Sequence, residues 1–191
     1  MANIFSTTTI SSQVRISCLA SSIRKEALPP RIQLFVWLLA RNRISSNVTF
    51  VRRGIFATDL ILCSCCDSEE STIYIVLHCK LAWSFWNLIL DSSNVTWVAL
   101  FSLENFFLQW IGLTSGRHHS IWMLIWFFGI WYLWKVRNNR IFKEESANIQ
   151  ILVFLTVCKA VEYHRTRNQS FPYSVNDVYR SIDFCYSNFY S

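Results

Sequence analysis

Four cysteines that lie close together in the sequence could hold a metal ion. Of the seven cysteines in 191 residues, Cys63, Cys65, Cys66 and Cys79 fall within seventeen residues, whereas the others are scattered. Cys63 and Cys66 have the Cys-x-x-Cys spacing with which one tight loop presents two thiolates to zinc, while a following helix supplies the other ligands. Such clustering, in a chain without a clear secretory signal, favours metal binding over disulfide formation.

The segments around these cysteines are predicted to be helical. An apolar run of helical character spans residues 31–40, and Ser45 or Ser46 can cap a shorter helix that Gly54 would end. These two helices would form a hairpin ahead of the cysteines. Apolar residues then recur at helical spacing over residues 81–89, which predicts a third helix beside the metal.

Further helices are expected downstream. Residues 121–134 (IWMLIWFFGIWYLW) carry no charge, but this run is short of the ~20 residues that cross a bilayer unassisted, so we expect a buried or interfacial helix. Residues 149–163 predict a last amphipathic helix, whereas residues 95–116 look less regular. Nine tryptophans against four glycines and three prolines favour a mostly α fold with a bulky core.

The second cysteine block carries a family pattern. Residues 70–79 read ESTIYIVLHC and lead into LAWSFW at residues 81–86. Together with Cys63 and Cys66, this stretch resembles the reverse transcriptase zinc-binding domain of plant LINE-like (non-LTR) retrotransposon polyproteins. The pattern of that family runs Cys-x2-Cys, then Glu-[Ser/Thr]-x2-His-x4-Cys, then a helix ending in tryptophan.

Flanking blocks strengthen this resemblance. PRIQLFVWLLA at residues 30–40 and RRGI at residues 52–55 are similar to upstream elements of the family. IWYLWKVRNNRIF at residues 130–142 is similar to the connector that precedes ribonuclease H in those polyproteins. Several blocks in the right order are more specific than any single one. The resemblance implies a non-catalytic module that helps to grip RNA or DNA, present here as a truncated reading frame.

The ligand set departs from the family pattern at one position. The family's histidine falls at Tyr74, and tyrosine is a poor zinc ligand at neutral pH because its pKa is about 10. His78 can replace the missing imidazole, although it adjoins Cys79, and Cys65 can supply a third thiolate, although it adjoins Cys66. The predicted ligands are Cys63, Cys66, Cys79 and His78. The alternatives are a rebuilt zinc site and one that has lost zinc.

Basic residues point to an anionic partner. The formal net charge is +6, and eight of the eighteen basic residues precede Leu62, where the acids are Glu26 and Asp59. Guanidinium groups suit phosphate, and clustered arginines release counterions on binding nucleic acid. Four arginines near the turn and end of the helical hairpin are the best candidates for such contacts: Arg41, Arg43, Arg52 and Arg53. A solvated basic face is the equal alternative.

Other residues favour structural roles over chemistry. The acids are scattered, with none between Asn105 and Lys143, so no pair is predicted to hold two catalytic metal ions, and there is no Gly-rich phosphate loop. We therefore predict that the chain is not an enzyme. His118 and His119 are more typical of a cap or loop than of a metal site, and Arg137 with Asn138 of helix-end hydrogen bonding. Four tryptophans at helical spacing favour core packing over base stacking: Trp83, Trp86, Trp131 and Trp134.

The predicted organisation has four segments. These are a polar N-terminal segment (1–28), a zinc-binding-like domain (29–92), a helical connector (93–166) and a loosely ordered tail (167–191). Another class of function, a membrane-associated or organelle-targeted helical protein, rests on the uncharged run and the acid-free start of the chain. We expect nucleic acid rather than a membrane as the partner, and a nuclear or cytoplasmic location, with a plastid as the alternative.

Overall fold

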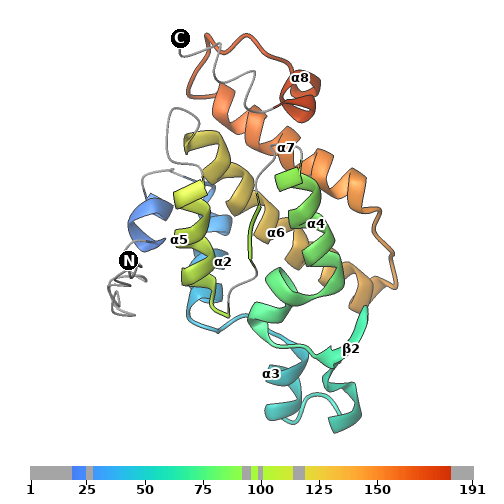
Figure 1. The fold of residues 1–191 in the computed structure, drawn as a ribbon. Coiled ribbons are helices and arrows are strands. Elements are labelled where there is room, and N and C mark those ends of the chain that lie inside the picture. The colour runs from blue at the N-terminus through green and yellow to red at the C-terminus, as the bar shows by residue number, and fades with distance from the viewer. Residues whose placement is uncertain (1–18, 25–27, 92–95, 99–100, 114–118, 182–191) are drawn as a thin grey trace, which may run out of the picture.

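The chain folds as an assembly of helices with one small sheet in the part that the structure describes (Figure 1). A computed structural model describes residues 19–24, 28–91, 96–98, 101–113 and 119–181. Most of these residues are helical, which confirms the predicted mostly α fold class. His118 and most of the polar N-terminal segment lie outside the described residues.

The helical hairpin predicted ahead of the cysteines is present. Helix α2 (Pro30–Ala40) begins with a proline, whose fixed φ suits the first helical turn and whose missing N–H costs nothing there. Helix α3 (Asn47–Arg52) is capped by Ser46, whose side chain accepts a hydrogen bond from the backbone of Thr49. Gly54 ends it with a φ of +68°, the left-handed conformation that glycine adopts at little cost.

The tight cysteine loop and the helix after it are present as predicted, and the loop joins two short strands that were not predicted. After a 3₁₀ turn, η1 (Thr58–Ile61), strands β1 (Leu62–Cys63) and β2 (Cys66–Glu69) pair antiparallel. A π-helical turn, η2 (Tyr74–His78), then leads into α4 (Lys80–Asp91). The β-hairpin is too small to be stable alone, so neighbouring elements must hold it.

The prediction of an irregular segment over residues 95–116 is wrong. Helix α5 (Leu103–Leu113) occupies much of it and buries Phe106, Phe107 and Trp110. These positions, together with buried Leu103, have helical spacing. The nearby glycine and polar residues obscured this pattern.

The described part of the C-terminal tail also contains regular structure, unlike the expected loose tail. Helix α7 (Ile149–Arg165) matches the predicted last helix. Beyond it, α8 (Val175–Arg180) begins with a capping box between Ser174 and Asp177. Val178 and Phe171 are buried, so the described tail packs on the core.

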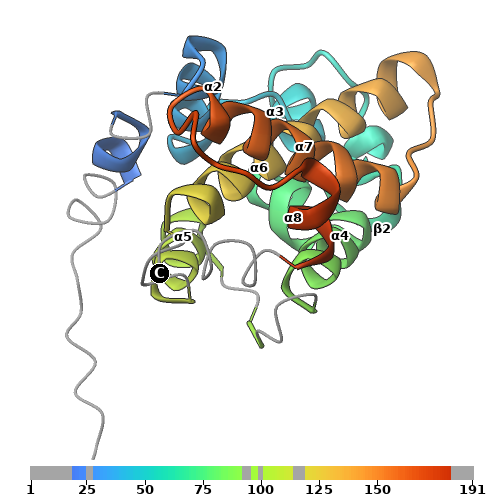
Figure 2. The same cartoon turned by 90° about the horizontal axis from the view of Figure 1, so that it is seen from above.

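The long helix α6 (His119–Lys143) is the centre of the fold. In Figure 1 it runs through the middle of the molecule, with α2 and α5 on one side and α4 and α7 on the other, and the view from above shows α7 lying along it (Figure 2). All residues from Ile121 to Ile130 are buried. The uncharged run is therefore a core helix covered by other helices. Among the described residues, no helix is both long enough and apolar enough to span a bilayer.

The four tryptophans of interest take different positions. Trp86 is fully buried, and its Nε1 donates a hydrogen bond to the carbonyl of Val76 at 2.8 Å. Trp131 and Trp134 are half-buried and pack against Phe35, with ring centroids 5.2 and 5.7 Å apart. These three fit the predicted packing role. Trp83 is more exposed and lies against Trp97.

The rings of Phe85 and Trp86 on α4 lie so close to the backbone of α6 that only glycine fits at position 129. A Cβ there would lie 2.8 Å from Trp86 and 3.0 Å from Phe85. We expect Gly129→Ala to destabilise the fold by about 1–3 kcal/mol, because the buried rings cannot move aside freely. In α5, a Cβ on Gly112 meets nothing within 4 Å, so Gly112→Ala should be neutral or stabilise by up to about 1 kcal/mol. Urea unfolding of both variants tests this, and equal effects would contradict the close α4–α6 contact.

Candidate metal centre

The β-hairpin places Cys63 and Cys66 opposite each other. They are cross-strand partners on either side of the turn formed by Ser64 and Cys65. Within this turn the backbone N–H of Cys65 points at the Cys63 sulfur, at 3.5 Å. The Cys-x-x-Cys spacing therefore gives the tight loop that the sequence predicted, with the N–H group of Cys65 directed at the Cys63 sulfur.

Cys79 approaches the hairpin from the start of α4. Its Sγ lies 3.7 Å from the Sγ of Cys63 and 3.8 Å from that of Cys66. With Zn–S bonds of 2.3 Å, two thiolates of a tetrahedral zinc site lie about 3.8 Å apart. Each of these two separations therefore fits a pair of thiolates on one zinc ion.

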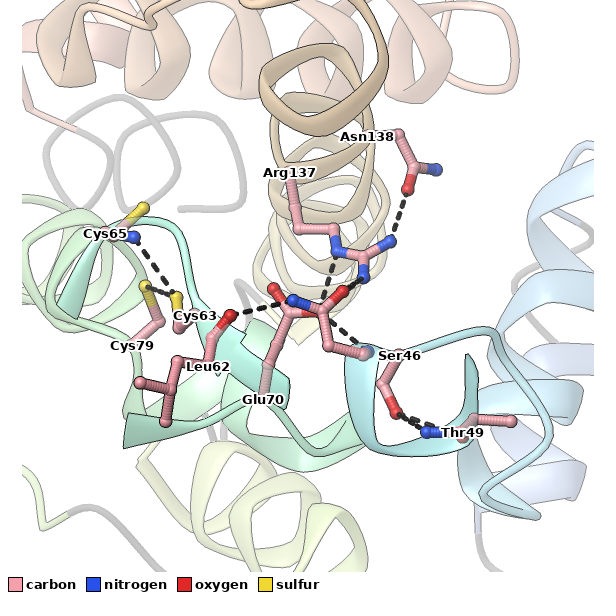
Figure 3. A network of polar contacts seen from close by, with 10 residues as sticks. Ser46, Thr49, Leu62, Cys63, Cys65, Glu70, Cys79, Arg137 and Asn138 are labelled. Atoms are coloured by element: carbon pink, nitrogen blue, oxygen red, sulfur yellow. Dashed lines mark hydrogen bonds and ion pairs between the residues drawn. The ribbon is translucent and has the colours of Figure 1, made fainter. Parts of the chain in front are cut away.

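Cys65 also belongs to this cluster. Its sulfur and those of Cys63 and Cys79 all lie within 4.8 Å of one another, so these three side chains could hold a metal ion. Figure 3 shows these three side chains gathered at the hairpin. Of the predicted ligands, Cys63 and Cys79 are in this group. The sulfur of Cys66 lies outside the group, 3.8 Å from that of Cys79.

His78 takes a separate position. It ends the π-helical turn, and its ring lies 6.5 Å from that of Phe101, measured between centroids. Partial burial lowers the pKa of His78. His78 is outside the group of thiols that come within 4.8 Å of one another, so the structure brings the predicted ligands together only in part.

Tyr74, at the position of the family's histidine, faces the same cluster. Its hydroxyl lies 2.8 Å from the sulfur of Cys66. Burial, together with the hydrogen bond to Cys66, raises the pKa of Tyr74 to about 12. Burial alone would raise the pKa of Cys66, but hydrogen bonds from Tyr74 and the backbone N–H of Lys80 lower it overall. Tyr74 is thus a protonated donor to Cys66.

Without metal, the other two sulfurs hold their protons. The hydrogen bond with Cys65 lowers the pKa of Cys63, but the hydrogen bond with Cys79 and burial outweigh it and raise the pKa to about 12. At Cys79 the hydrogen bond with Cys63 lowers the pKa, whereas that with Cys65 and burial raise it to about 12. A metal ion binding here must displace these protons.

Helix α6 joins the site through a buried ion pair (Figure 3). The Nη2 of Arg137 contacts the Oε1 of Glu70, and their side chains are only 7% and 1% exposed. The Nε of Arg137 also donates to that oxygen at 3.0 Å, and its Nη2 donates to the Oδ1 of Asn47 at 2.8 Å. The backbone N–H of Asn47 donates to the same carboxylate oxygen at 3.1 Å. One guanidinium therefore connects α6, α3 and the end of the β-hairpin.

This network corrects the helix-end interpretation of Arg137 and Asn138. Both lie inside α6, six and five residues before its end at Lys143. Arg137 donates to the side chain of Asn138 at 3.0 Å, but its main partner is Glu70. One turn further on, Arg140 donates a hydrogen bond to the sulfur of Cys65. Sequence analysis missed these links, although Arg137 and Glu70 both occupy positions that belong to the family pattern.

The four predicted phosphate-binding arginines are exposed. Arg41 and Arg43 follow the end of α2, whereas Arg52 and Arg53 lie at the end of α3. Within the described part of the chain none of them forms an ion pair, and Arg41 lies over the ring of Trp37 at 4.1 Å. His119, one of the two histidines set aside, is the half-buried first residue of α6.

The helical hairpin, the cysteine-bearing β-hairpin and α4 together have the build of a small zinc-binding domain. Residues 4–86 match the family model for zinc-binding in reverse transcriptase, so this part of the chain is similar to that family. The match includes Cys63, Cys66 and Cys79 but ends before α6. The chain has no match among curated proteins or solved structures.

The buried ion pair should matter more to stability than an exposed one. Glu70→Gln leaves the Arg137 charge buried without its counter-charge, and we expect a loss of about 3–5 kcal/mol in unfolding free energy. Lys159 and Glu162 form an exposed pair at 2.6 Å, so Glu162→Gln should change stability by less than about 1 kcal/mol. Chemical denaturation of the two variants checks the difference. Similar losses would show that the Arg137 contact is not a structural tie.

Proposed function

We propose that this chain is a non-catalytic accessory module of a LINE-type reverse transcriptase, which binds one zinc ion and contacts nucleic acid. The observation that carries the proposal is the cluster of thiols around Cys79, in which the sulfurs of Cys63, Cys65 and Cys79 all lie within 4.8 Å of one another. The family match over residues 4–86 supports it. Such a module would act in the nucleus or cytoplasm.

Zinc would serve here as a structural cross-link. Cys63 lies on the β-hairpin and Cys79 at the start of α4, so an ion held by both fixes the hairpin to that helix. Structural zinc sites contribute directly to folding free energy, because the unfolded chain has no preformed site.

The nucleic-acid part of the proposal rests on charge. Arg41, Arg43, Arg52 and Arg53 are exposed and form no ion pair with another described residue. Helix α2 contains no acidic residue. Free guanidinium groups at the ends of α2 and α3 suit contacts with phosphates, which give affinity without sequence preference.

Metal analysis of the purified full-length chain tests the zinc proposal. We expect one zinc per chain for the natural sequence and a strong loss for Cys79→Ser, because Cys79 is adjacent to both sulfurs of the hairpin. Cys158 lies on α7, outside the cluster, so Cys158→Ser is the matched control and should keep its zinc. A natural chain free of zinc, or full zinc in Cys79→Ser, would refute the proposal.

Salt-dependent binding to a single-stranded RNA oligonucleotide tests the nucleic-acid proposal. Replacing Arg41, Arg43, Arg52 and Arg53 by Gln should weaken binding and lower the slope of log affinity against log salt by about 3, since each phosphate contact contributes roughly 0.7.

A matched control removes the same charge elsewhere. It replaces four exposed basic residues by Gln: Lys135, Lys143, Arg165 and Arg180. The control should keep most of the slope. An equal effect of both sets would show that net charge, and not the two helix ends, governs binding.

A further inference from the structure

We infer that the metal centre of this chain is a three-thiolate site made by Cys63, Cys65 and Cys79, with Arg140 as its charge partner and Cys66 outside the ligand set. This inference rests on the proposed zinc function and names the residues of that site. It differs from the Cys-x-x-Cys pairing of Cys63 with Cys66 that the family pattern implies.

A small cavity favours this set. Its volume is about 20 Å³, enough for one water-sized occupant. Cys63, Cys65 and Cys79 line it together with Glu70 and Arg140, whereas Cys66 and Tyr74 do not. The same three sulfurs lie within 4.8 Å of one another. Two observations therefore select the same three thiols.

Tyr74 explains why Cys66 is left out. Its hydroxyl lies 2.8 Å from the Cys66 sulfur, which gives that sulfur a hydrogen-bond partner without a metal. A histidine at position 74 would offer an imidazole nitrogen as a ligand, whereas a protonated phenol binds zinc poorly. Since Cys65 and Cys66 are consecutive, both can hardly reach one tetrahedral ion. The tyrosine at the position of the family's histidine thus accompanies a change of zinc ligand from Cys66 to Cys65.

Charge favours the same arrangement. Arg140 donates a hydrogen bond to the Cys65 sulfur, and the Arg137–Glu70 pair lies beside the cavity. A zinc ion with the two guanidinium groups would balance three thiolates and the Glu70 carboxylate, so the buried centre would carry no net charge. A neutral centre avoids the cost of an uncompensated buried charge. Groups that contact the ligands without binding the metal themselves commonly tune metal affinity.

Glu70 provides a further polar group at the cavity. Its Oε1 accepts the bonds from Arg137 and Asn47, whereas its buried Oε2 has no hydrogen-bond partner in the described part of the chain. Three thiolates leave one position of a tetrahedral ion for another donor.

The test is a Zn²⁺ and Co²⁺ titration of the full-length chain, with cobalt reporting thiolate ligands by its absorption. Cys65→Ser should lose more than about 100-fold in affinity, beyond the 10–100-fold typical of an outer partner. Cys66→Ser should stay close to the natural chain, as should the remote control Cys158→Ser. Arg140→Gln should weaken binding by about 10–100-fold, whereas Lys143→Gln, which removes an exposed charge from the same helix, should not.

Restoring the family's histidine gives a second measurement. In the Cys65→Ser background, Tyr74→His should recover metal binding, because Cys66 can then join Cys63, Cys79 and the new imidazole. Circular dichroism of each variant separates loss of metal from loss of fold.

The outcomes distinguish the two proposals. If the natural chain binds metal and Cys66→Ser, but not Cys65→Ser, abolishes the thiolate absorption, the three-thiolate inference is overturned while the zinc function stands. If the natural chain binds no metal, both fail.

Discussion

The buried ion pair between Arg137 and Glu70 is the interaction on which the rest of the structure depends. It joins residues 67 positions apart in the sequence and brings α3 in through Asn47. Burying two charges is costly, and such pairs often add little net stability. Their effect is to select one arrangement, because any other would leave a charge unpaired. Here the selected arrangement places α6 against the cysteine-bearing hairpin, beyond the residues that the family model covers.

That placement matters because the β-hairpin cannot hold its own shape. Strand β1 has two residues and β2 has four, and an isolated hairpin of this size is not stable in water. It is held by Asn47, whose side chain donates to the Leu62 carbonyl at 2.8 Å, by Glu70, and by the thiols that face Cys79. A metal ion would add a cross-link at the point where these contacts meet. The cysteine-bearing hairpin and α6 are therefore one structural unit.

Local signals predicted much of this fold. Pro30, Ser46 and Gly54 mark helix ends by their own backbone chemistry, so α2 and α3 followed from sequence. Helix α5 was missed because its apolar spacing is short and lies among polar residues. The Cys-x-x-Cys spacing predicted the tight loop but not its strands. It could not decide between Cys65 and Cys66, since this depends on which way the turn faces. The roles of Arg137 and Arg140 depend on a contact between distant segments, which spacing along one helix does not reveal.

Hydrogen–deuterium exchange of the full-length chain, with zinc bound and after chelation, tests the central claim that the metal centre and α6 form one unit. We predict that bound zinc slows amide exchange both in residues 62–79 and in the C-terminal turns of α6 around Arg137 and Arg140. The exchange rate of α8 should change little. Protection of the hairpin alone, with α6 exchanging at the same rate in both states, would contradict the account. It would mean that the connector helix packs independently of the metal.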